Sequence, residues 1–357
     1  MAVEQQNRRI SPAERNARFA MATRQNWQML PAISGELNST VSFNLPKVRY
    51  LSKVRLLVEA VITATHASAT TYTPAPFAPF SLLRKVSMDI NNGFSPFKLS
   101  GKELYLYSLI RNNAGVYDVM TSGRGRVVQG VAAGPDGVAN TVRFVADLPV
   151  NVNDRDPIGM ILLQNEETVV TVTVDFADLD GLAPATSGYT FDVSNIKVTP
   201  MVETFSLPVA RDAQPDISVL KLVHSTSQTI SGSGVQTLAL PVGNTYRKLA
   251  LYIEDDSGVG VADADIAGNF ELVLNQADIP YNIKPSVLAA INQEQFDTIL
   301  PQGFYVFDFS YQGLSGYGGS RDFIDTERLT EFWFRFNASA AGKITAIYET
   351  LSRLRTR

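Results

Sequence analysis

The sequence predicts an all-β protein: two tandem eight-stranded jelly-roll β-sandwiches, a double jelly roll, with an N-terminal helix. Three observations carry this prediction. Short alternating segments fill the chain from residue 37 onward, clusters of Gly, Pro, Asn and Asp separate them, and several segments recur once in the second half. Alternating strands with long, turn-rich connections are typical of antiparallel sandwiches, and eight strands in two sheets form a jelly roll.

The composition narrows the classes of function. The chain has 357 residues, 45% apolar and 18% charged, which suggests about two globular domains. Without cysteine, disulfides, thiolate catalysis and Cys-ligated metals are excluded, and two histidines, His66 and His224, cannot supply a His-rich metal centre. We expect no membrane span and no signal peptide. The formal net charge of −4 argues against coating of nucleic acid, and we expect no sequence-specific nucleic-acid partner.

The first 30 residues read as a basic helix. Ser11 is a suitable N-cap, with Pro12 in the first turn and Glu14 three positions after the cap, and helix-favouring residues continue until Pro31. Two interpretations stay open: a helix packed on its own domain, or an arm that contacts a neighbour or an anionic surface. A partial apolar stripe consists of Ala13, Ala17, Ala20 and Met21, with Phe19 and Trp27 beside it, and the basic residues are Arg8, Arg9, Arg15, Arg18 and Arg24.

Four later segments show the alternation of β-strands most clearly. Each carries apolar residues on one side and polar residues on the other, as expected for strands with one face in a core. They are TVSFNL (40–45), KVRLLVE (53–59), VVTVTVDF (169–176) and EFWFRFNA (331–338).

One segment occurs twice. The two copies are LPKVRYLSKVRLLVEA (45–60) and LPVGNTYRKLALYIED (240–255). Lys53 matches Lys248 and Glu59 matches Glu254 without a gap, an offset of 248 − 53 = 195. We expect this segment to be the second strand of each jelly roll.

Three further matches follow in the same order, and their offset falls from 184 to 161 to 146. They are VSMDIN with FELVLN (86–91, 270–275), FVADL with YVFDF (144–148, 305–309) and VETFSLP with YETLSRL (202–208, 348–354). A helical segment follows VSMDIN in the first half and FELVLN in the second; these segments are GKELYLYSLIRNN and KPSVLAAINQEQF. A falling offset is expected for two copies of one domain when the second has shorter loops. We expect an N-terminal helical arm (1–36), a first jelly roll (37–207), a linker (208–216) and a second jelly roll with a basic C-terminal tail (217–357).

No segment predicts a catalytic, cofactor or metal site, and we do not expect an enzyme. Asp147 and Asp308 form a symmetric acidic pair, but equivalent positions in separate copies should lie far apart, so a structural role is favoured. Structural roles are also favoured for both histidines. The acidic loop 254–267 fits no standard calcium loop, and whether it binds an ion stays open. Two alternatives remain: a tandem-sandwich spike or lectin-type binding protein, and a double-sandwich glycan hydrolase.

Arginines return at the C-terminus, at Arg353, Arg355 and Arg357. A solvated tail is the simplest interpretation. In a jelly roll with an even number of strands, however, the chain leaves at the end where it entered. The Arg-rich N-terminal helix and the C-terminal tail would then share one end of the molecule, and that end would suit phosphate-bearing partners.

The paired segments at 45–60 and 240–255, together with the leading SPAERNARFAMATRQNWQML, resemble the double jelly-roll major capsid proteins of tectiviruses. These are tailless icosahedral phages with an internal membrane, and the resemblance is greatest to those of Gram-positive hosts. It implies homotrimers whose six sandwiches form pseudo-hexagonal capsomers, which tile an icosahedral shell around the membrane vesicle. It also implies synthesis in the host cytoplasm, location in the virion, and further copies, the membrane, penton or vertex proteins and minor capsid proteins as partners.

The same resemblance assigns the basic termini to the inner face of the shell. The residues expected to contact the membrane are Arg8, Arg9, Arg15, Arg18, Arg24, Arg353, Arg355 and Arg357.

Overall fold

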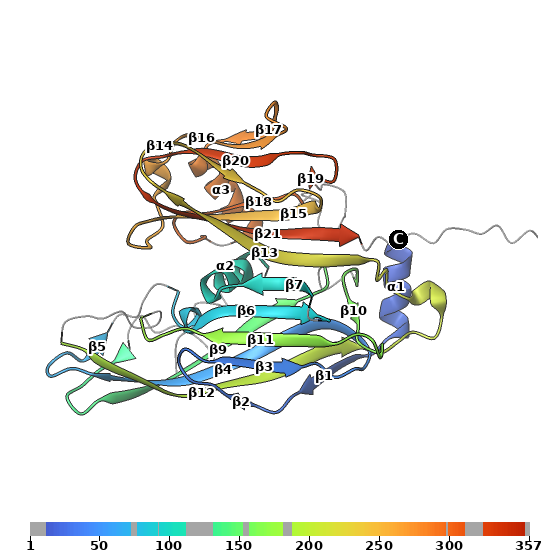
Figure 1. The fold of residues 1–357 in the computed structure, drawn as a ribbon, viewed down its shortest axis with the longest axis horizontal. Helices are drawn as coiled ribbons and strands as arrows, with labels where there is room; N and C mark the ends of the chain where they lie inside the picture. Colours follow the sequence, from blue (N-terminus) through green and yellow to red (C-terminus); the bar gives the residue numbers. More distant parts are fainter. Residues whose placement is uncertain are drawn as a thin grey trace, which may run out of the picture.

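In the computed structural model, two β-sandwiches are stacked one above the other, with a helix beside the lower one (Figure 1). The second sandwich, at the top of the view, is formed by the C-terminal part of the chain. The structure describes residues 12–72, 77–91, 93–111, 131–152, 157–180, 188–297, 299–310 and 324–353.

The first sandwich consists of two sheets that enclose one apolar core. One sheet contains β1 (Gln25–Met29), β2 (Ile33–Ser34), β12 (Thr190–Phe205), β4 (Tyr50–Thr65), β9 (Val138–Pro149) and β10 (Ile161–Leu162). The facing strands are β3 (Thr40–Asn44), β11 (Val170–Phe176), β6 (Leu83–Ile90) and β7 (Phe94–Leu99), and helix α2 (Gly101–Arg111) follows β7. A small additional sheet pairs β5 (Thr71–Tyr72) with β8 (Val131–Ala132).

The second sandwich repeats this plan. One side contains β13 (Val219–Ile230), β21 (Gly342–Arg353), β15 (Thr245–Asp255), β18 (Phe304–Asp308) and β19 (Ile324–Asp325). The other contains β14 (Gly234–Ala239), β20 (Phe332–Ala338), β16 (Ala267–Leu274) and β17 (Asp278–Ile283), and helix α3 (Pro285–Phe296) follows β17.

Strand order is the same in both sandwiches. The order β1-β12-β4-β9 matches β13-β21-β15-β18, and β3-β11-β6-β7 matches β14-β20-β16-β17. Each helix occupies the same place, between the fifth and sixth of these eight strands. The prediction of two eight-stranded jelly rolls is therefore confirmed.

The register of the strands reproduces the repeat read from the sequence. Lys53 on β4 lies opposite Glu203 on β12, and Lys248 on β15 lies opposite Glu349 on β21. The offset of 195 between the two lysines and the offset of 349 − 203 = 146 between the two glutamates therefore describe the same pairing. The repeated segment is, however, the third of the eight strands. The expectation of a second strand is wrong because β1 precedes β3 within the segment predicted as helix.

The N-terminal helix is shorter than predicted. Helix α1 (Pro12–Ala22) ends well before Pro31, because β1 pairs with β12 over its full length and this pairing outweighs the helix propensity of Gln and Met. Phe19 is the residue that anchors α1. Its ring packs against Tyr50 and Phe205, with centroids 6.3 and 5.7 Å apart.

The described part of the predicted apolar stripe is not the packed face of this helix. Ala17 and Ala20 are exposed, and Met21 is 82% exposed. Of the two open interpretations, the described part of α1 fits a helix packed on its own domain, through Phe19.

Candidate functional site

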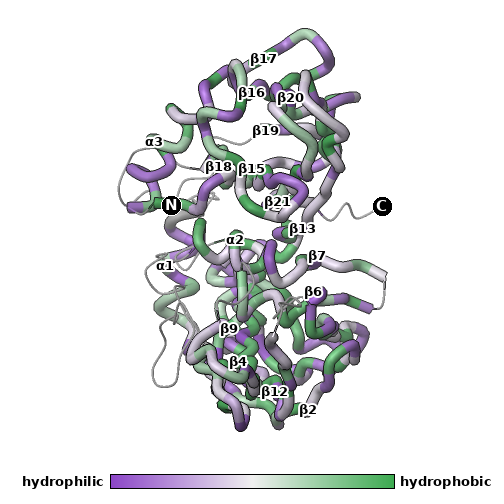
Figure 2. The backbone as a smooth tube through the Cα atoms, turned by 90° about the vertical axis from the view of Figure 1, so that its left-hand side faces the viewer, coloured by the Kyte–Doolittle hydropathy of each residue, from purple (hydrophilic) through white to green (hydrophobic). Residues whose placement is uncertain are grey.

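The junction between the two sandwiches is the most elaborate internal site. Strand β7 of the first sandwich lies parallel to β13 of the second, with Phe97 beside Val223, so that one nine-stranded sheet passes through both. Helix α2 lies between the sandwiches, with β13 and β21 above it and β7 and β9 below it (Figure 2). Ala250, Tyr252, Val306 and Ile347 of the second sandwich are buried within the core cluster of the first.

One end of α2 is held by aromatic and charged contacts. The ring of Phe77 meets the ring of Tyr252 edge to face, with centroids 5.4 Å apart. The Lys102 ammonium lies 4.3 Å from the centroid of the Tyr252 ring and forms an ion pair with Glu254 on β15. These contacts join a helix and a loop of the first sandwich to the third main strand of the second.

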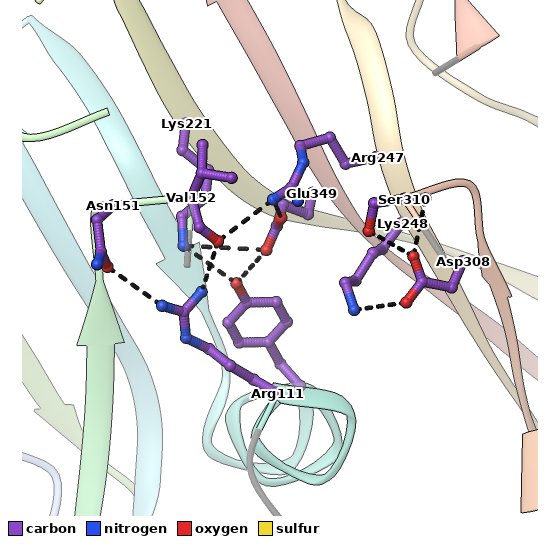
Figure 3. A network of polar contacts seen from close by, with 10 residues as sticks. Arg111, Asn151, Val152, Lys221, Arg247, Lys248, Asp308, Ser310 and Glu349 are labelled. Atoms are coloured by element: carbon purple, nitrogen blue, oxygen red, sulfur yellow. Dashed lines mark hydrogen bonds and ion pairs between the residues drawn. The ribbon is translucent and has the colours of Figure 1, made fainter. Parts of the chain in front are cut away.

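The other end of α2 is held by a buried network around Glu349 (Figure 3). The guanidinium of Arg247 donates to one carboxylate oxygen of Glu349, and the hydroxyl of Tyr107 donates to the other. The Lys221 ammonium lies 3.9 Å from this second oxygen and 3.4 Å from the Tyr107 hydroxyl. The side chains of Lys221, Arg247 and Glu349 are 0%, 6% and 2% exposed, so these charges are withdrawn from water.

Arg111 extends the network into the first sandwich. Its guanidinium donates to the side-chain oxygen of Asn151 at 3.1 Å and to the carbonyl of Val152 at 3.3 Å, in the loop that follows β9. Arg247 of the second sandwich also donates to the Val152 carbonyl, at 3.3 Å. One carbonyl thus connects cations from both sandwiches.

These surroundings decide the protonation of the network. Burial alone would raise the pKa of Glu349, but the charges of Lys221, Arg247 and Arg111 outweigh it and lower that pKa to about 2. Burial lowers the pKa of Lys221 well below its usual value, and the charge of Arg111 adds to the effect. Burial, and then the Glu349 carboxylate, raises the pKa of the Tyr107 hydroxyl well above its usual value. At neutral pH Glu349 is an anion and Tyr107 a neutral donor.

The network holds the two sandwiches together. Its members come from α2, the loop after β9, β13, β15 and β21, so the two sandwiches must dock correctly before the charges are compensated. Removing one partner of a buried ion pair leaves an uncompensated charge and typically costs about 3 to 5 kcal/mol. Of these residues the repeat pointed only to Glu349, as the partner of Glu203. No local pattern marks Tyr107, Arg111, Lys221 or Arg247.

Both members of the acidic pair have structural surroundings, but they do not occupy equivalent positions. Asp147 lies opposite Arg55, whereas Asp308 lies opposite Lys248, the match of Lys53. Asp147 on β9 lies 3.3 Å from the guanidinium of Arg55 on β4, and Asp308 on β18 lies 2.6 Å from the ammonium of Lys248 on β15. Ser310 also donates to Asp308 through its amide and hydroxyl, at 2.9 and 2.6 Å (Figure 3). Each carboxylate balances the cation on the neighbouring strand, as the sequence favoured.

Part of the predicted basic surface comes together at one end of the molecule. Arg18 forms ion pairs with Asp212, in the segment between the sandwiches, and with Glu14, at 3.0 Å for the latter. Hydrogen bonds from Ser218 lower the pKa of Asp216, and the charges of Arg15 and Arg353 lower it further. Arg15 on α1 and Arg353 at the end of β21 therefore both lie near Asp216.

The remaining predicted basic residues differ in what the structure describes. Arg24 is exposed, two residues after the end of α1, and its backbone exchanges hydrogen bonds with Ser206 at 2.9 and 3.0 Å. Outside the described residues lie Arg8, Arg9, Arg355 and Arg357.

Both histidines make local hydrogen bonds to the backbone. His66 accepts from the amides of Ser68 and Ala69 at 3.1 and 2.7 Å, and a ring nitrogen of His224 lies 2.7 Å from the carbonyl of Ser95. These positions agree with the structural roles favoured for them.

The described residues offer neither a metal-binding cluster nor a helix that could span a membrane. They contain no group of three or more His, Asp or Glu side chains arranged to hold a metal ion. Within the same ranges, every helix is too short or too polar to cross a membrane. In the acidic loop, Asp255 accepts from the amides of Ser257 and Val259 at 2.8 and 3.0 Å, and Asp263 accepts from the Tyr305 hydroxyl at 2.6 Å.

Comparison with known proteins shows the fold. No family model and no curated protein matches the chain. Among solved structures, the STIV MCP is similar with a TM-score of 0.69 and 13% identity, over 92% of this chain and 97% of that one. The PBCV-1 virus capsid gives 0.62 and 12%, over 92% and 93%. The major capsid protein P2 from bacteriophage PM2 gives 0.54 and 12%, over 94% and 99%. The chain has the double jelly-roll fold of these capsid proteins.

Proposed function

We propose that this chain is a viral major capsid protein that assembles as homotrimers, whose six sandwiches form a pseudo-hexagonal capsomer of an icosahedral shell. The observation that carries the proposal is the internal junction, which joins two jelly rolls of the same strand order through a shared sheet and a buried ion-pair network. Three such chains around a threefold axis would present six similar units to their neighbours. The likeness to solved capsid proteins over more than nine-tenths of the chain supports the same role.

The finer proposal is a tectivirus-like shell around an internal membrane, in a phage of a Gram-positive host. The chain would be made in the host cytoplasm and reside in the virion, with penton or vertex and minor capsid proteins as further partners. The position of Arg15 and Arg353 near Asp216 supports a basic end that faces the anionic membrane, with α1 and the C-terminal tail on that side.

The oligomeric state tests the main proposal. We expect light scattering coupled to size-exclusion chromatography to give a stable species of three times the 39.0 kDa chain mass. A chain that stays monomeric at all concentrations tested would contradict the capsid proposal.

Flotation with anionic vesicles tests the membrane-facing end. We expect the trimer to float with phosphatidylglycerol vesicles and the variant R15E/R353E to lose most of that binding. The matched control is Arg84→Glu, an exposed position at the start of β6. Equal flotation of both variants would contradict the assignment of the basic end while leaving the trimer untouched.

A further inference from the structure

The internal junction uses one set of strands from each sandwich. The equivalent set of the other sandwich keeps exposed side chains outside the contact that α1 makes with Tyr50 and Phe205. The first sandwich contributes β7 and α2, and the second contributes β13 together with the outer face of β21, β15 and β18. The equivalents of β7 and α2 are β17 and α3, in the second sandwich. The equivalents of β13, β21, β15 and β18 are β1, β12, β4 and β9, in the first.

The unused strands are sheet edges with exposed aromatic side chains. Strands β7 and β17 match residue for residue at an offset of 278 − 94 = 184, which places Tyr281 at the position of Phe97. Val223 lies opposite Glu349 just as Trp27 lies opposite Glu203, so Trp27 takes the position of Val223. The contact pair Phe97 and Val223 is 1% and 0% exposed, whereas Tyr281 is 38% and Trp27 57% exposed.

The two helices differ in the same way. At the offset of 184, the inward-facing Leu104 of α2 matches Leu288 of α3, and both are buried. The same offset matches Tyr107 with Ile291. Tyr107 reaches into the second sandwich and is 1% exposed, whereas Ile291 is 37% exposed.

The sheet faces complete the pattern. Phe304 on β18, opposite Tyr252, is 2% exposed and packs within the core cluster of the first sandwich. Its equivalent on β9 is Val145, opposite Leu57, which is 40% exposed. Edge strands with free backbone groups and exposed apolar side chains are ready sites for pairing with another chain. At the internal junction, the equivalents of β17 and α3 pack against the equivalents of β1, β12, β4 and β9. A second copy of this chain therefore offers each exposed set a partner of matching shape.

We propose that β17 of one chain pairs in parallel with β1 of the next, with Tyr281 beside Trp27. The outer face of α3, with Val287 and Ile291, then packs on the outer face of β12, β4 and β9, which includes Val145. This inference rests on the proposed homotrimer and identifies the surfaces that form it. The contact is head to tail, and such contacts close into rings when the rotation between chains permits.

The contact between chains differs from the internal junction in its chemistry. At the equivalent positions, Ile291 replaces Tyr107, Gln25 replaces Lys221 and Ser52 replaces Arg247. Only the glutamate recurs, as Glu203. At the positions of Ala250 and Val306 the first sandwich instead carries Arg55 and Asp147, whose side chains lie 3.3 Å apart. Arg55 also lies 3.9 Å from Glu203. The surface between chains therefore combines exposed aromatic and apolar edges with one ion-pair network on the outer face of the first sandwich.

A disulfide trap tests the proposed pairing directly, because the chain contains no cysteine. Opposed residues on neighbouring strands lie roughly 5 Å apart, within the Cα separations that disulfides accept. The double variant W27C/Y281C should form a covalent trimer on a non-reducing gel after mild oxidation. Neither single variant should do so, nor should W27C/V235C, whose second cysteine lies at a 68% exposed position on β14.

A second pair of variants covers the case in which the cysteines disturb folding. Ile291→Lys should abolish the trimer while the chain keeps its folded circular dichroism spectrum, because the ammonium would be buried between chains, whereas Val235→Lys should leave the trimer intact. If the wild-type chain is a trimer but W27C/Y281C gives no covalent trimer and Ile291→Lys still assembles, the proposed surfaces are wrong and the capsid role stands. If the wild-type chain forms no trimer, the proposed function fails and this inference with it.

Discussion

The junction network and the basic end both gather cations around carboxylates, but they differ in access to water. At the junction, Lys221 and Arg247 face Glu349 with almost no exposure. At the basic end, Arg18 pairs with Asp212 while their side chains remain 38% and 42% exposed. Buried charges are costly unless they are paired, so the first cluster enforces one arrangement of the two sandwiches. Exposed charges are screened and exchange partners easily, so the second cluster is suited to contacts outside the chain.

The largest effect should follow from Glu349→Gln. The variant keeps the shape but leaves Lys221 and Arg247 buried without their anion, and we expect a loss of about 3 to 5 kcal/mol in the free energy of unfolding. Urea unfolding followed by tryptophan fluorescence measures it. A loss similar to that of an exposed substitution would mean that the network does not hold the junction.

Acid should act through the same carboxylate. Because the folded-state pKa of Glu349 is about 2, below the ordinary value of 4.5, its contribution to stability is fully present above about pH 4.5 and is lost as the pH falls toward 2. The contribution is on the order of 3 kcal/mol. Unfolding titrations of the wild type and of Glu349→Gln from pH 5 to pH 2 should converge. Parallel curves across this window would contradict the assignment.

A smaller effect is expected from Tyr107→Phe. The substitution removes one hydroxyl that donates to Glu349, and hydrogen bonds to charged groups contribute roughly 1.5 to 3 kcal/mol. In a double-mutant cycle with Glu349→Gln, the two changes should be strongly non-additive because they remove the same contact. If the losses in the free energy of unfolding are additive, the Tyr107 hydroxyl does not stabilise the fold through its hydrogen bond to Glu349.

The smallest effect should come from the basic end. Asp212→Asn removes an exposed partner of Arg18, and we expect no measurable change in the urea midpoint. A clear destabilisation would show that the ion pairs at this end also stabilise the fold, as those of the buried junction network do. The proposed difference between the two clusters would then be wrong.

Sequence reasoning recovered the fold because the repeat is carried by local patterns. Alternation placed Val54, Leu56 and Val58 on a core face, and all three are fully buried. The match of Lys53 with Lys248 held because both lysines lie opposite a glutamate of the last strand. Strand β1 was missed because its residues favour helix locally, and only pairing with a distant strand makes them extended.

The junction could not be predicted in the same way. Tyr107, Lys221 and Glu349 lie more than a hundred residues apart from one another, and each is unremarkable in its own segment. Their meeting depends on how two complete sandwiches dock, which no local periodicity encodes. Trp27 and Tyr281 occupy the positions of Val223 and Phe97, and their role as a candidate contact follows only when the two sandwiches are compared position by position.

Electron microscopy of the purified chain distinguishes a capsomer from isolated chains. We expect class averages of pseudo-hexagonal particles, with six similar lobes around a threefold axis and three chains in each. Particles that contain only two lobes, at concentrations where the protein is fully folded, would contradict the proposed homotrimer.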